Sequence, residues 1–296
     1  METLLMTGAS RGLGRAAAEK ILRERPDVHL VVTARGGELA AELAESTGNP
    51  NVTALPCDLA STRSIRAAAG KLSGHRLSGF IGNAGLQLTS RAHATEDGIE
   101  PTFAVNVLAN HLFVRLLWNR FTAPGRIVLV GSDTHFGDLR HNLGMVPAPR
   151  WEPIADLARP RPEARTAADG RTAYSTSKLA VVYLAHALAR RLPDGIDVYT
   201  FNPGYVPGTG LVRDAGPVVR FLSRTLLRAL TATPLALSPA RAGALLADAA
   251  IGPRPGESGA YVDRWAAAGS SPESYDHDRE EELWRALCAL EPVEML

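Results

Sequence analysis

Cysteine is scarce in this sequence. Only Cys57 and Cys288 occur among 296 residues, far apart and outside any Cys-x-x-Cys or cysteine/histidine spacing. This pattern excludes a disulfide framework and a structural zinc site built on cysteine. We therefore expect no metal site and a reducing, cytoplasmic setting.

The sequence also lacks an excess of either charge and lacks a long apolar run. Its 32 basic and 31 acidic residues give a net charge of +1, which argues against nucleic acid as a partner. It has no apolar run of about 18 residues, the length that would indicate a membrane helix. The first residues carry no basic leader before a glycine-rich turn. We expect a soluble, unprocessed protein without an integral membrane segment.

The chain alternates between short apolar runs and longer segments rich in alanine and leucine, and 45% of its residues are hydrophobic. Apolar runs bounded by turn residues predict strands, and the segments between them predict crossover helices. The predicted strands span residues 4–7, 29–34, 52–55, 79–81, 126–130 and 198–201. The predicted helices span residues 15–25, 39–47, 61–71, 98–121 and 173–191. This order predicts an α/β fold with a Rossmann-type, doubly wound parallel sheet.

We predict that residues 1–296 form a single domain. Residues 1–203 would hold mainly the cofactor-binding and catalytic core, and residues 204–296 the substrate loop and the C-terminal part. Between residues 138 and 168 the composition shifts to proline, arginine and alanine, which is incompatible with a continuous helix or strand. We interpret residues 138–168 as an inserted surface segment.

The first chemical motif is the glycine-rich turn at residues 7–14, which reads Thr-Gly-Ala-Ser-Arg-Gly-Leu-Gly. Glycines allow a tight turn and let backbone N–H groups at a helix start approach a pyrophosphate closely. An ordinary strand-to-helix turn is the alternative. The position between a predicted strand and a predicted helix favours a dinucleotide site.

The residues after the second predicted strand indicate which nicotinamide cofactor is bound. NAD-selective folds commonly place a carboxylate there for the ribose 2′-hydroxyl, whereas this sequence has Thr33, Ala34 and Arg35. Arg35 and Arg11 can form charge-assisted hydrogen bonds to a 2′-phosphate, which favours NADP(H). Two solvated surface arginines are the alternative. Asp58 either faces the adenine or caps the helix that follows it, and the sequence leaves both open.

A second motif places Tyr174 and Lys178 one turn apart on the same face of a predicted helix. A phenol has an ordinary pKa of about 10 and is a poor acid or base at neutral pH. A nearby ammonium group favours the phenolate and allows proton exchange with a substrate oxygen. Taken alone, such a pair is better explained as an ordinary surface pair.

Six features in order resemble the short-chain dehydrogenase/reductase family. They are the glycine-rich turn, Asn83-Ala84-Gly85, Asn106, Ser132, the Tyr174/Lys178 pair and Pro203-Gly204. Agreement in both order and context extends from residue 7 to residue 204, which makes the resemblance highly specific.

The resemblance implies a catalytic set. In this reading Tyr174 is the proton donor or acceptor, Ser132 positions the substrate carbonyl, and Lys178 holds the nicotinamide ribose and lowers the pKa of the tyrosine. Asn106 would anchor a water in the proton relay. The alternatives are that Asn106 only satisfies helix backbone groups and that Ser132 is a turn serine.

The resemblance also implies an NADP(H) site. Residues 83–85 would support the sheet beside the cofactor, and the loop at residues 203–209 would contact the nicotinamide carboxamide. The predicted cofactor-binding residues are Thr7, Gly8, Ser10, Arg11, Gly12, Leu13, Gly14, Arg35, Asp58, Leu59, Asn83, Ala84, Gly85, Asn106, Tyr174, Lys178, Pro203, Gly204, Val206 and Thr209.

Within the family, the sequence is similar to the group that contains retinol dehydrogenases and light-dependent protochlorophyllide reductases. Residues 95–106, residues 174–180 and parts of residues 258–284 carry this similarity. The insertion at residues 138–168, ahead of the catalytic tyrosine, departs from the commoner family pattern. In related reductases such an insertion crosses a surface used for oligomer contacts, so we expect a monomer or homodimer rather than a tetramer.

The substrate side of the sequence leaves alternatives open. Residues 211–237 are apolar, with Arg220, Arg224 and Arg228 along one helical stripe. They fit a lid over a hydrophobic pocket, a packed helix with a solvated basic face, or contact with an acidic substrate or a membrane surface. The aromatic residues that could line a pocket or belong to the core are Trp151, Trp265 and Trp284.

We predict an NADPH-dependent oxidoreductase whose partner is a small-molecule carbonyl substrate. It would reduce a ketone or aldehyde of a bulky, largely apolar compound, such as a polycyclic secondary metabolite, to the alcohol, with Tyr174 protonating the oxygen. One alternative is a C=C double-bond reductase of the protochlorophyllide-reductase type. Another is a non-catalytic nucleotide-binding regulatory protein, against which the presence of Asn106, Ser132 and the Tyr174/Lys178 pair argues.

Overall fold

An eight-stranded sheet runs through the computed structural model, which describes residues 2–142, 144–207, 236–291 and 293. The strand order is β3-β2-β1-β4-β5-β6-β7-β8, with parallel pairing throughout except for the antiparallel β7–β8 pair. The strands are β1 (Glu2–Thr7), β2 (Val28–Ala34), β3 (Val52–Pro56), β4 (Leu77–Gly82), β5 (Phe121–Val130), β6 (Ile196–Asn202), β7 (Tyr261–Asp263) and β8 (Ala266–Ala268). The predicted doubly wound, mostly parallel sheet is confirmed.

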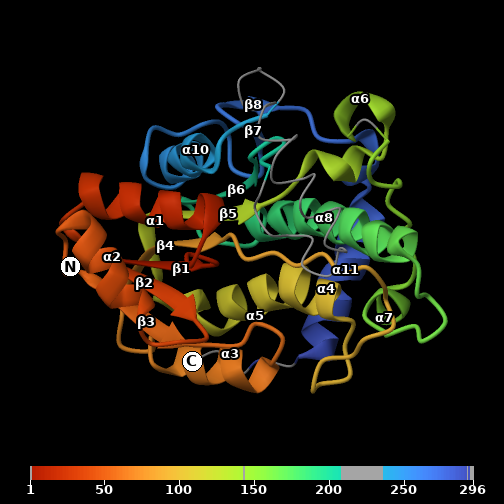
Figure 1. The fold of residues 1–296 in the computed structure, drawn as a ribbon, viewed down its shortest axis with the longest axis horizontal. Coiled ribbons are helices and arrows are strands. Elements are labelled where there is room, and N and C mark those ends of the chain that lie inside the picture. The colour runs from red at the N-terminus through yellow and green to blue at the C-terminus, as the bar shows by residue number, and fades with distance from the viewer. Residues whose placement is uncertain (1, 143, 208–235, 292, 294–296) are drawn as a thin grey trace.

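Helices cover both faces of this sheet, and Figure 1 shows α1 and α10 on one side with α3 and α5 on the other. The α-helices are α1 (Gly12–Glu24), α2 (Leu39–Thr47), α3 (Thr62–Gly70), α4 (Pro101–Phe103), α5 (Ala109–Leu116), α6 (Leu139–Asn142), α7 (Ile154–Leu157), α8 (Ala167–Ala189), α10 (Pro239–Ile251) and α11 (His277–Leu290). The remaining helical turns are the π-helical η1 (Ala104–Leu108) and the 3-10 segments η2 (Trp118–Arg120), η3 (Asp133–Phe136) and η5 (Pro272–Tyr275).

The two hydrophobic cores follow from the alternation of side chains along each strand. Successive strand residues point to opposite faces, so Leu4 and Met6 join the core under α1, α2 and α10. Leu5, between them, joins the larger core under α3, α5, α8 and α11. Strands buried on both faces read as continuous apolar runs, which is why the sequence revealed them.

The strand order reverses between β1 and β4. In open α/β sheets, ligands bind in the crevice outside the carboxyl ends of the strands at such a point. The glycine-rich turn follows β1, and Asn83 follows β4, so both lie at this crevice.

The helix predicted at residues 98–121 is wrong in its extent. It begins at Pro101, where the Glu100 side chain accepts a hydrogen bond from the Phe103 N–H at 2.7 Å. A π-helical turn interrupts it at Ala104–Leu108, and α5 ends at Leu116. Apolar periodicity persists through this stretch because β5, which starts at Phe121, is also buried at its first residue. The pattern therefore did not mark the end of the helix.

The helix that carries the tyrosine and lysine begins earlier than predicted, at Ala167. Thr166 accepts a hydrogen bond from the Asp169 N–H, and the Asp169 carboxylate accepts one from the Thr166 N–H. This reciprocal capping box satisfies two N–H groups at the helix start.

The interpretation of residues 138–168 as a surface segment is corrected by the burial of its middle part. Ile154 and Leu157 are buried in the larger core, whereas Leu139 is 75% exposed. Backbone hydrogen bonds from Arg91 to Ala164 and from Arg161 to Arg91 fasten the segment to the loop after β4. The segment is thus partly a structural element of the core.

Residues after 203 contribute to the same sheet and the same cores. Strand β7 pairs with β6, and α11 packs on α8. A Cβ added at Gly243 of α10 would lie 2.4 Å from the Leu13 carbonyl oxygen, so α10 and the start of α1 are in very close contact. Within the described residues, none of the helices is both long and apolar enough to span a bilayer.

Candidate active site

The glycine-rich turn is folded too tightly for a side chain at Gly8 or Gly14. Gly8 and Gly12 have φ values of +74° and +60°, a region that favours glycine. A Cβ at Gly14 would lie 2.1 Å from the Gly8 carbonyl oxygen. Helix α1 starts at Gly12, and the Arg11 side chain makes no capping hydrogen bond to it. The turn therefore presents helix-start N–H groups of the kind that bind phosphate.

Asn83 and Ala84 hold this turn in place from the neighbouring strand. The Asn83 Nδ2 donates to the Gly8 carbonyl at 2.9 Å and to the Thr7 carbonyl at 3.3 Å. The Ala84 N–H donates to the Thr7 Oγ1 at 3.1 Å. These bonds join the carboxyl ends of β1 and β4 at the crevice.

Two predicted cofactor contacts lie at the ends of β2 and β3. Arg35 directly follows β2, is exposed, and makes no hydrogen bond or ion pair with any residue that the structure describes. Asp58 is exposed, and its carboxylate accepts a hydrogen bond from the Ala60 N–H at 3.0 Å. The cap of α3 is Ser61, so the capping alternative for Asp58 is wrong. Leu59 is partly buried against the larger core.

The structure brings Ser132, Tyr174 and Lys178 together beside the end of β5. Tyr174 and Lys178 are 6% and 3% exposed, and the Ser132 hydroxyl lies near enough to Tyr174 to affect its pKa. The Lys178 Nζ donates to the Val130 carbonyl at 2.8 Å and lies 5.5 Å from the centre of the Tyr174 ring. The Ser132 Oγ also accepts from the Thr134 N–H at 3.3 Å, as a turn serine would.

The electrostatics of this group favour a neutral phenol. Burial raises the pKa of Tyr174, the nearby Ser132 hydroxyl opposes this shift, and the negative charge of Asp133 adds to it. Burial lowers the pKa of Lys178 to about 8. Lowering of the tyrosine pKa by Lys178, which the family resemblance implies, stays a prediction. A protonated phenol at this position can donate a proton.

Asn106 lies in the π-helical turn η1 and is buried. Its side chain exchanges hydrogen bonds with the backbone of Leu86, at 2.8 and 3.0 Å, and donates to the Ser177 Oγ at 2.9 Å. It therefore ties the loop after β4 to α8 rather than satisfying its own helix. The Asn106 backbone carbonyl accepts from the Asn110 Nδ2 at 2.7 Å.

His135 is a site residue that sequence reasoning missed. It is fully buried, and its Nδ1 lies 2.6 Å from the Ser132 carbonyl oxygen, while its Nε2 lies 3.1 Å from the Ser271 backbone nitrogen. Because the carbonyl can only accept and the N–H can only donate, the ring is the neutral tautomer with its proton on Nδ1. Burial lowers the pKa of His135 to about 4, which keeps this tautomer at neutral pH.

Asp133 is the second missed residue. Its carboxylate accepts from the Ser132 Oγ at 3.4 Å, and burial raises its pKa to about 6. The nearby negative charge of Asp263 adds to this shift. A residue next to Ser132 in sequence could have been suspected, but only the fold shows that its side chain turns back toward the serine.

The loop after β6 reaches the other side of the crevice. Gly204 has a φ of +69°, and its N–H donates to the Asn202 Oδ1 at 3.1 Å. Val206 is buried against Ala242 of α10 and against Leu13 of the glycine-rich turn. The loop that holds Pro203, Gly204 and Val206 therefore lies on the same side of the crevice as the glycine-rich turn. Of the predicted residues, those outside the described part of the chain are Thr209, Arg220, Arg224 and Arg228.

The three tryptophans considered as pocket residues have different surroundings. Trp151 packs edge-on against Tyr183 at 4.9 Å between ring centres, and Trp284 packs against His111 at 5.2 Å. Trp265 is 63% exposed at the turn between β7 and β8. Among the described residues, the one cluster with metal-ligand geometry comprises His277, Glu280 and Glu281, and the two glutamates are ion-paired with arginines.

Comparison with known proteins matches both the sequence and the fold. A family model described as short chain dehydrogenase matches residues 2–141. The protochlorophyllide reductase of Chlamydomonas reinhardtii is 31% identical over 306 residues, covering 96% of this chain and 76% of the relative. Human retinol dehydrogenase 13 is 31% identical, covering 96% and 82%. A putative daunorubicin C-13 ketoreductase from a Streptomyces species is 35% identical, covering 69% and 66%.

Solved structures share the fold at lower identity. An uncharacterised protein from Mycobacterium paratuberculosis superposes with a TM-score of 0.68 at 21% identity, covering all of this chain and 95% of the other. A blue fluorescent protein from a metagenomic library, solved in complex with NADPH, superposes with a TM-score of 0.62 at 22% identity, covering 88% and 95%. The relatives thus agree with the sequence motifs on one family.

Proposed function

Because the chain belongs to the short-chain dehydrogenase/reductase family, within the group of retinol dehydrogenases and protochlorophyllide reductases, we propose that it is an NADPH-dependent carbonyl reductase. It would reduce a ketone or aldehyde of a bulky, largely apolar compound to the alcohol. The observation that carries this proposal is the buried Tyr174 phenol, which lies near the Ser132 hydroxyl and beside the Lys178 ammonium.

The choice of NADPH is supported by the end of β2. Arg35 is exposed there and has no ion-pair partner among the described residues, so it is available to a 2′-phosphate. A carboxylate at the same place would repel that phosphate and favour NAD. Arg11, the residue preceding α1, adds a second positive charge on this side of the turn.

The turn fits the pyrophosphate of a dinucleotide, because its glycines let the backbone fold tightly and lead directly into the N-terminus of α1. When bound, the nicotinamide supplies the hydride for the reaction. The protein provides the rest of the chemistry. Ser132 orients the substrate oxygen, and the Tyr174 hydroxyl gives that oxygen its proton. The phenolate left on Tyr174 is stabilised by the Lys178 ammonium, 5.5 Å from the ring centre.

The names of the relatives support a bulky apolar substrate. They include a retinol dehydrogenase, a protochlorophyllide reductase and a putative ketoreductase of daunorubicin. A second reaction, reduction of a C=C bond, is favoured by the match to protochlorophyllide reductase, which extends over 96% of the chain. The two reactions differ in their product: an alcohol forms in the first, and a saturated carbon–carbon bond in the second.

The test is NADPH oxidation by the purified protein with a panel of bulky and small ketones and aldehydes, with products identified by mass spectrometry and NMR. We expect alcohols from the bulky compounds. Replacing Tyr174 with Phe should lower the rate by at least about 100-fold, the usual contribution of a general acid, without changing the Kd for NADPH. Turnover of small ketones only would contradict the proposed substrate class. No turnover of any carbonyl compound, with saturation of an activated alkene, would establish the second reaction.

A further inference from the structure

A cavity lies against α8, away from the Tyr174/Lys178 pair. Its volume is about 170 Å³, and residues 150–164 of the insertion form part of its wall. The α8 side of the wall includes Ala173, Thr176 and Ser177. With 3.6 residues per turn, these side chains project from a different face of the helix than Tyr174 and Lys178. The cavity is therefore distinct from the candidate active site.

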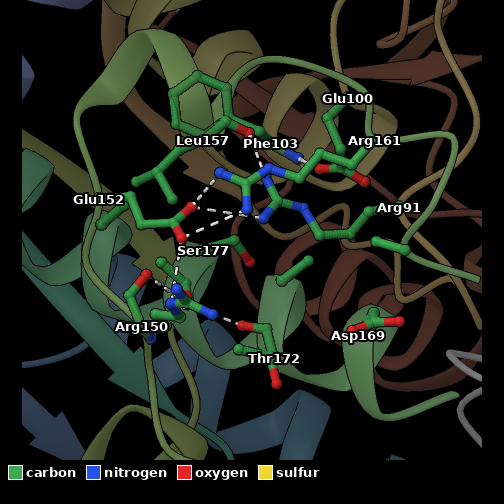
Figure 2. A pocket seen from close by; sticks show the side chains of 14 residues that line it. Arg91, Glu100, Phe103, Arg150, Glu152, Leu157, Arg161, Asp169, Thr172 and Ser177 are labelled. Atoms are coloured by element: carbon green, nitrogen blue, oxygen red, sulfur yellow. Dashed lines mark hydrogen bonds and ion pairs between the residues drawn. The ribbon is translucent and has the colours of Figure 1, made fainter. Parts of the chain in front are cut away.

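Arginine side chains dominate this cavity. Figure 2 shows the guanidinium groups of Arg91, Arg150 and Arg161 gathered around the carboxylate of Glu152. The closest N–O distances to Glu152 are 3.7, 3.1 and 2.6 Å, respectively. Within the described residues, Glu152 is the one carboxylate that forms an ion pair with them. Three cations thus share a single anionic partner.

Three arginines and one ion-paired carboxylate make up this network. Burial and the positive charge of Arg161 lower the pKa of Arg91, whereas the charges of Glu100 and Glu152 raise it. Asp169, another acid on the wall, accepts hydrogen bonds from Thr166 at the start of α8 and forms no ion pair with these three arginines. An added anion would relieve the repulsion between the guanidinium groups.

Two buried polar atoms on the wall have no hydrogen-bond partner. They are the Arg91 Nε and the Glu100 Oε1, and Glu100 is only 1% exposed. The Arg91 Nε–H is a donor that lies beside the guanidinium groups of Arg150 and Arg161. Burial raises the pKa of Glu100. An unpaired guanidinium donor next to two further arginines is complementary to an oxyanion.

The size of the cavity limits the ligand. Pockets for drug-sized molecules and cofactors usually measure about 300–1,000 Å³, well above this volume. A nicotinamide cofactor or a bulky ketone is therefore excluded, while a molecule of a few heavy atoms fits.

We propose that this cavity is a binding site for a small oxyanion, a carboxylate or a phosphate, held by Arg91, Arg150 and Arg161. The insertion supplies two of these three arginines, which gives residues 138–168 a role that the sequence did not reveal. The occupant would also adjoin Ser177, whose hydroxyl accepts from Asn106 and donates to the Tyr174 carbonyl at 2.7 Å. The cavity is therefore next to the hydrogen bonds that join Asn106 to α8, the helix that carries Tyr174 and Lys178.

The test is thermal unfolding of the full chain, titrated separately with sodium acetate and sodium phosphate at an ionic strength held constant with sodium chloride. Ligands that bind only the folded state raise the unfolding temperature, and above the Kd the rise follows the logarithm of the ligand concentration. We expect such a rise with at least one anion, and a Kd derived from it that is at least about tenfold higher in Arg161→Gln, which lacks the guanidinium group. A rise with acetate alone would assign a carboxylate ligand, and a rise with phosphate alone a phosphate.

Three further variants make the test specific. Arg150→Gln alters a 75%-exposed side chain, so it should fold even if Arg161→Gln does not, and it should also raise the Kd. Arg63→Gln alters an 86%-exposed side chain on α3 and should leave the Kd unchanged. Arg35→Asp should also leave it unchanged, which separates this site from the phosphate groups of the cofactor site. The absence of a rise in unfolding temperature with either anion, or an equal Kd in Arg150→Gln and the unaltered chain, would overturn the proposal.

Discussion

Two hydrogen bonds on one imidazole connect Ser132 to the C-terminal part of the chain. His135 donates to the Ser132 carbonyl and accepts from the Ser271 N–H, and its ring lies 5.0 Å from that of Tyr261. Ser132 is therefore held by a buried, neutral histidine as well as by its own turn. His135 acts through Ser132, so we regard it as a positioning residue.

This role predicts a kinetic effect that depends on Ser132. His135→Phe should lower kcat about 10- to 100-fold, the range expected when a reacting group is displaced by about 1 Å. The Kd for NADPH should not change, and His135→Gln, which can still donate and accept, should recover part of the rate. In a Ser132→Ala background the loss caused by His135→Phe should nearly vanish. An equal loss in both backgrounds would show a general structural defect instead.

Asp133 predicts a change in pH dependence. Its carboxylate raises the pKa of Tyr174, so Asp133→Asn should lower that pKa. Reduction requires the protonated phenol, so the alkaline limb of the kcat profile should move to lower pH. Below about pH 6 Asp133 is itself protonated, and the two profiles should converge there.

The measurement is the pH profile of kcat with saturating NADPH and ketone for Asp133→Asn and the unaltered chain. Asp194→Asn, an exposed carboxylate in the loop before β6, is the matched control and should leave the profile unchanged. An alkaline limb that stays in place in Asp133→Asn would show that the carboxylate does not act on Tyr174.

At the scale of elements, the glycine-rich turn makes the sharpest prediction. A Cβ at Gly14 would clash with the backbone of Gly8 and with the Asn83 side chain, 2.4 Å away. Gly14→Ala should therefore weaken NADPH binding and cost about 1–3 kcal/mol in the free energy of unfolding, as overpacking usually does.

Gly70→Ala is the matched control for this change. Gly70 ends α3, and its Cβ would meet no atom within 4 Å. Chemical denaturation and NADPH titration of both variants compare the two glycines directly. Equal stability and equal Kd for Gly14→Ala and Gly70→Ala would show that the close approach of Gly8 to Gly14 is not needed.

The elements that the sequence predicted best are those with strong local signals. Strands β1 to β6 were found because each is an apolar run bounded by turn residues, as in residues 29–34. Strands β7 and β8 were not predicted, because three residues carry too little periodicity and Ala266–Ala268 is fully exposed. Predicted helix ends differ from the observed ones where a cap or a π turn, such as Ala104–Leu108, determines where the helix begins or ends.

In the candidate site, too, the sequence predicted the residues that have a local motif and missed those that depend on the fold. Family motifs located Ser132 and the Tyr174/Lys178 pair, which the fold brings together beside β5. His135 could not be found in this way, because its partner Ser271 lies far along the chain and meets it only after folding. The arginine cavity depends equally on the packing of residues 138–168 against α8, which composition alone placed on the surface.

At the scale of the whole molecule, the site is assembled where the strand order reverses. The ends of β1 and β4 provide the phosphate-binding turn, and the ends of β5 and β6 bring in Ser132 and Gly204. The end of β2 places Arg35 at the outer part of the same crevice. The sheet therefore orders the predicted contacts along an extended dinucleotide, from 2′-phosphate to nicotinamide.

The measurement that tests this account most directly is a fluorescence titration of the purified chain with NADPH and with NADH at matched salt. We predict saturable binding with a lower Kd for NADPH, and loss of that preference in Arg35→Asp, which replaces the proposed phosphate partner with a repelling charge. Tighter binding of NADH, or an unchanged preference in Arg35→Asp, would contradict the assigned cofactor. Binding of neither nucleotide would contradict the proposed enzyme itself.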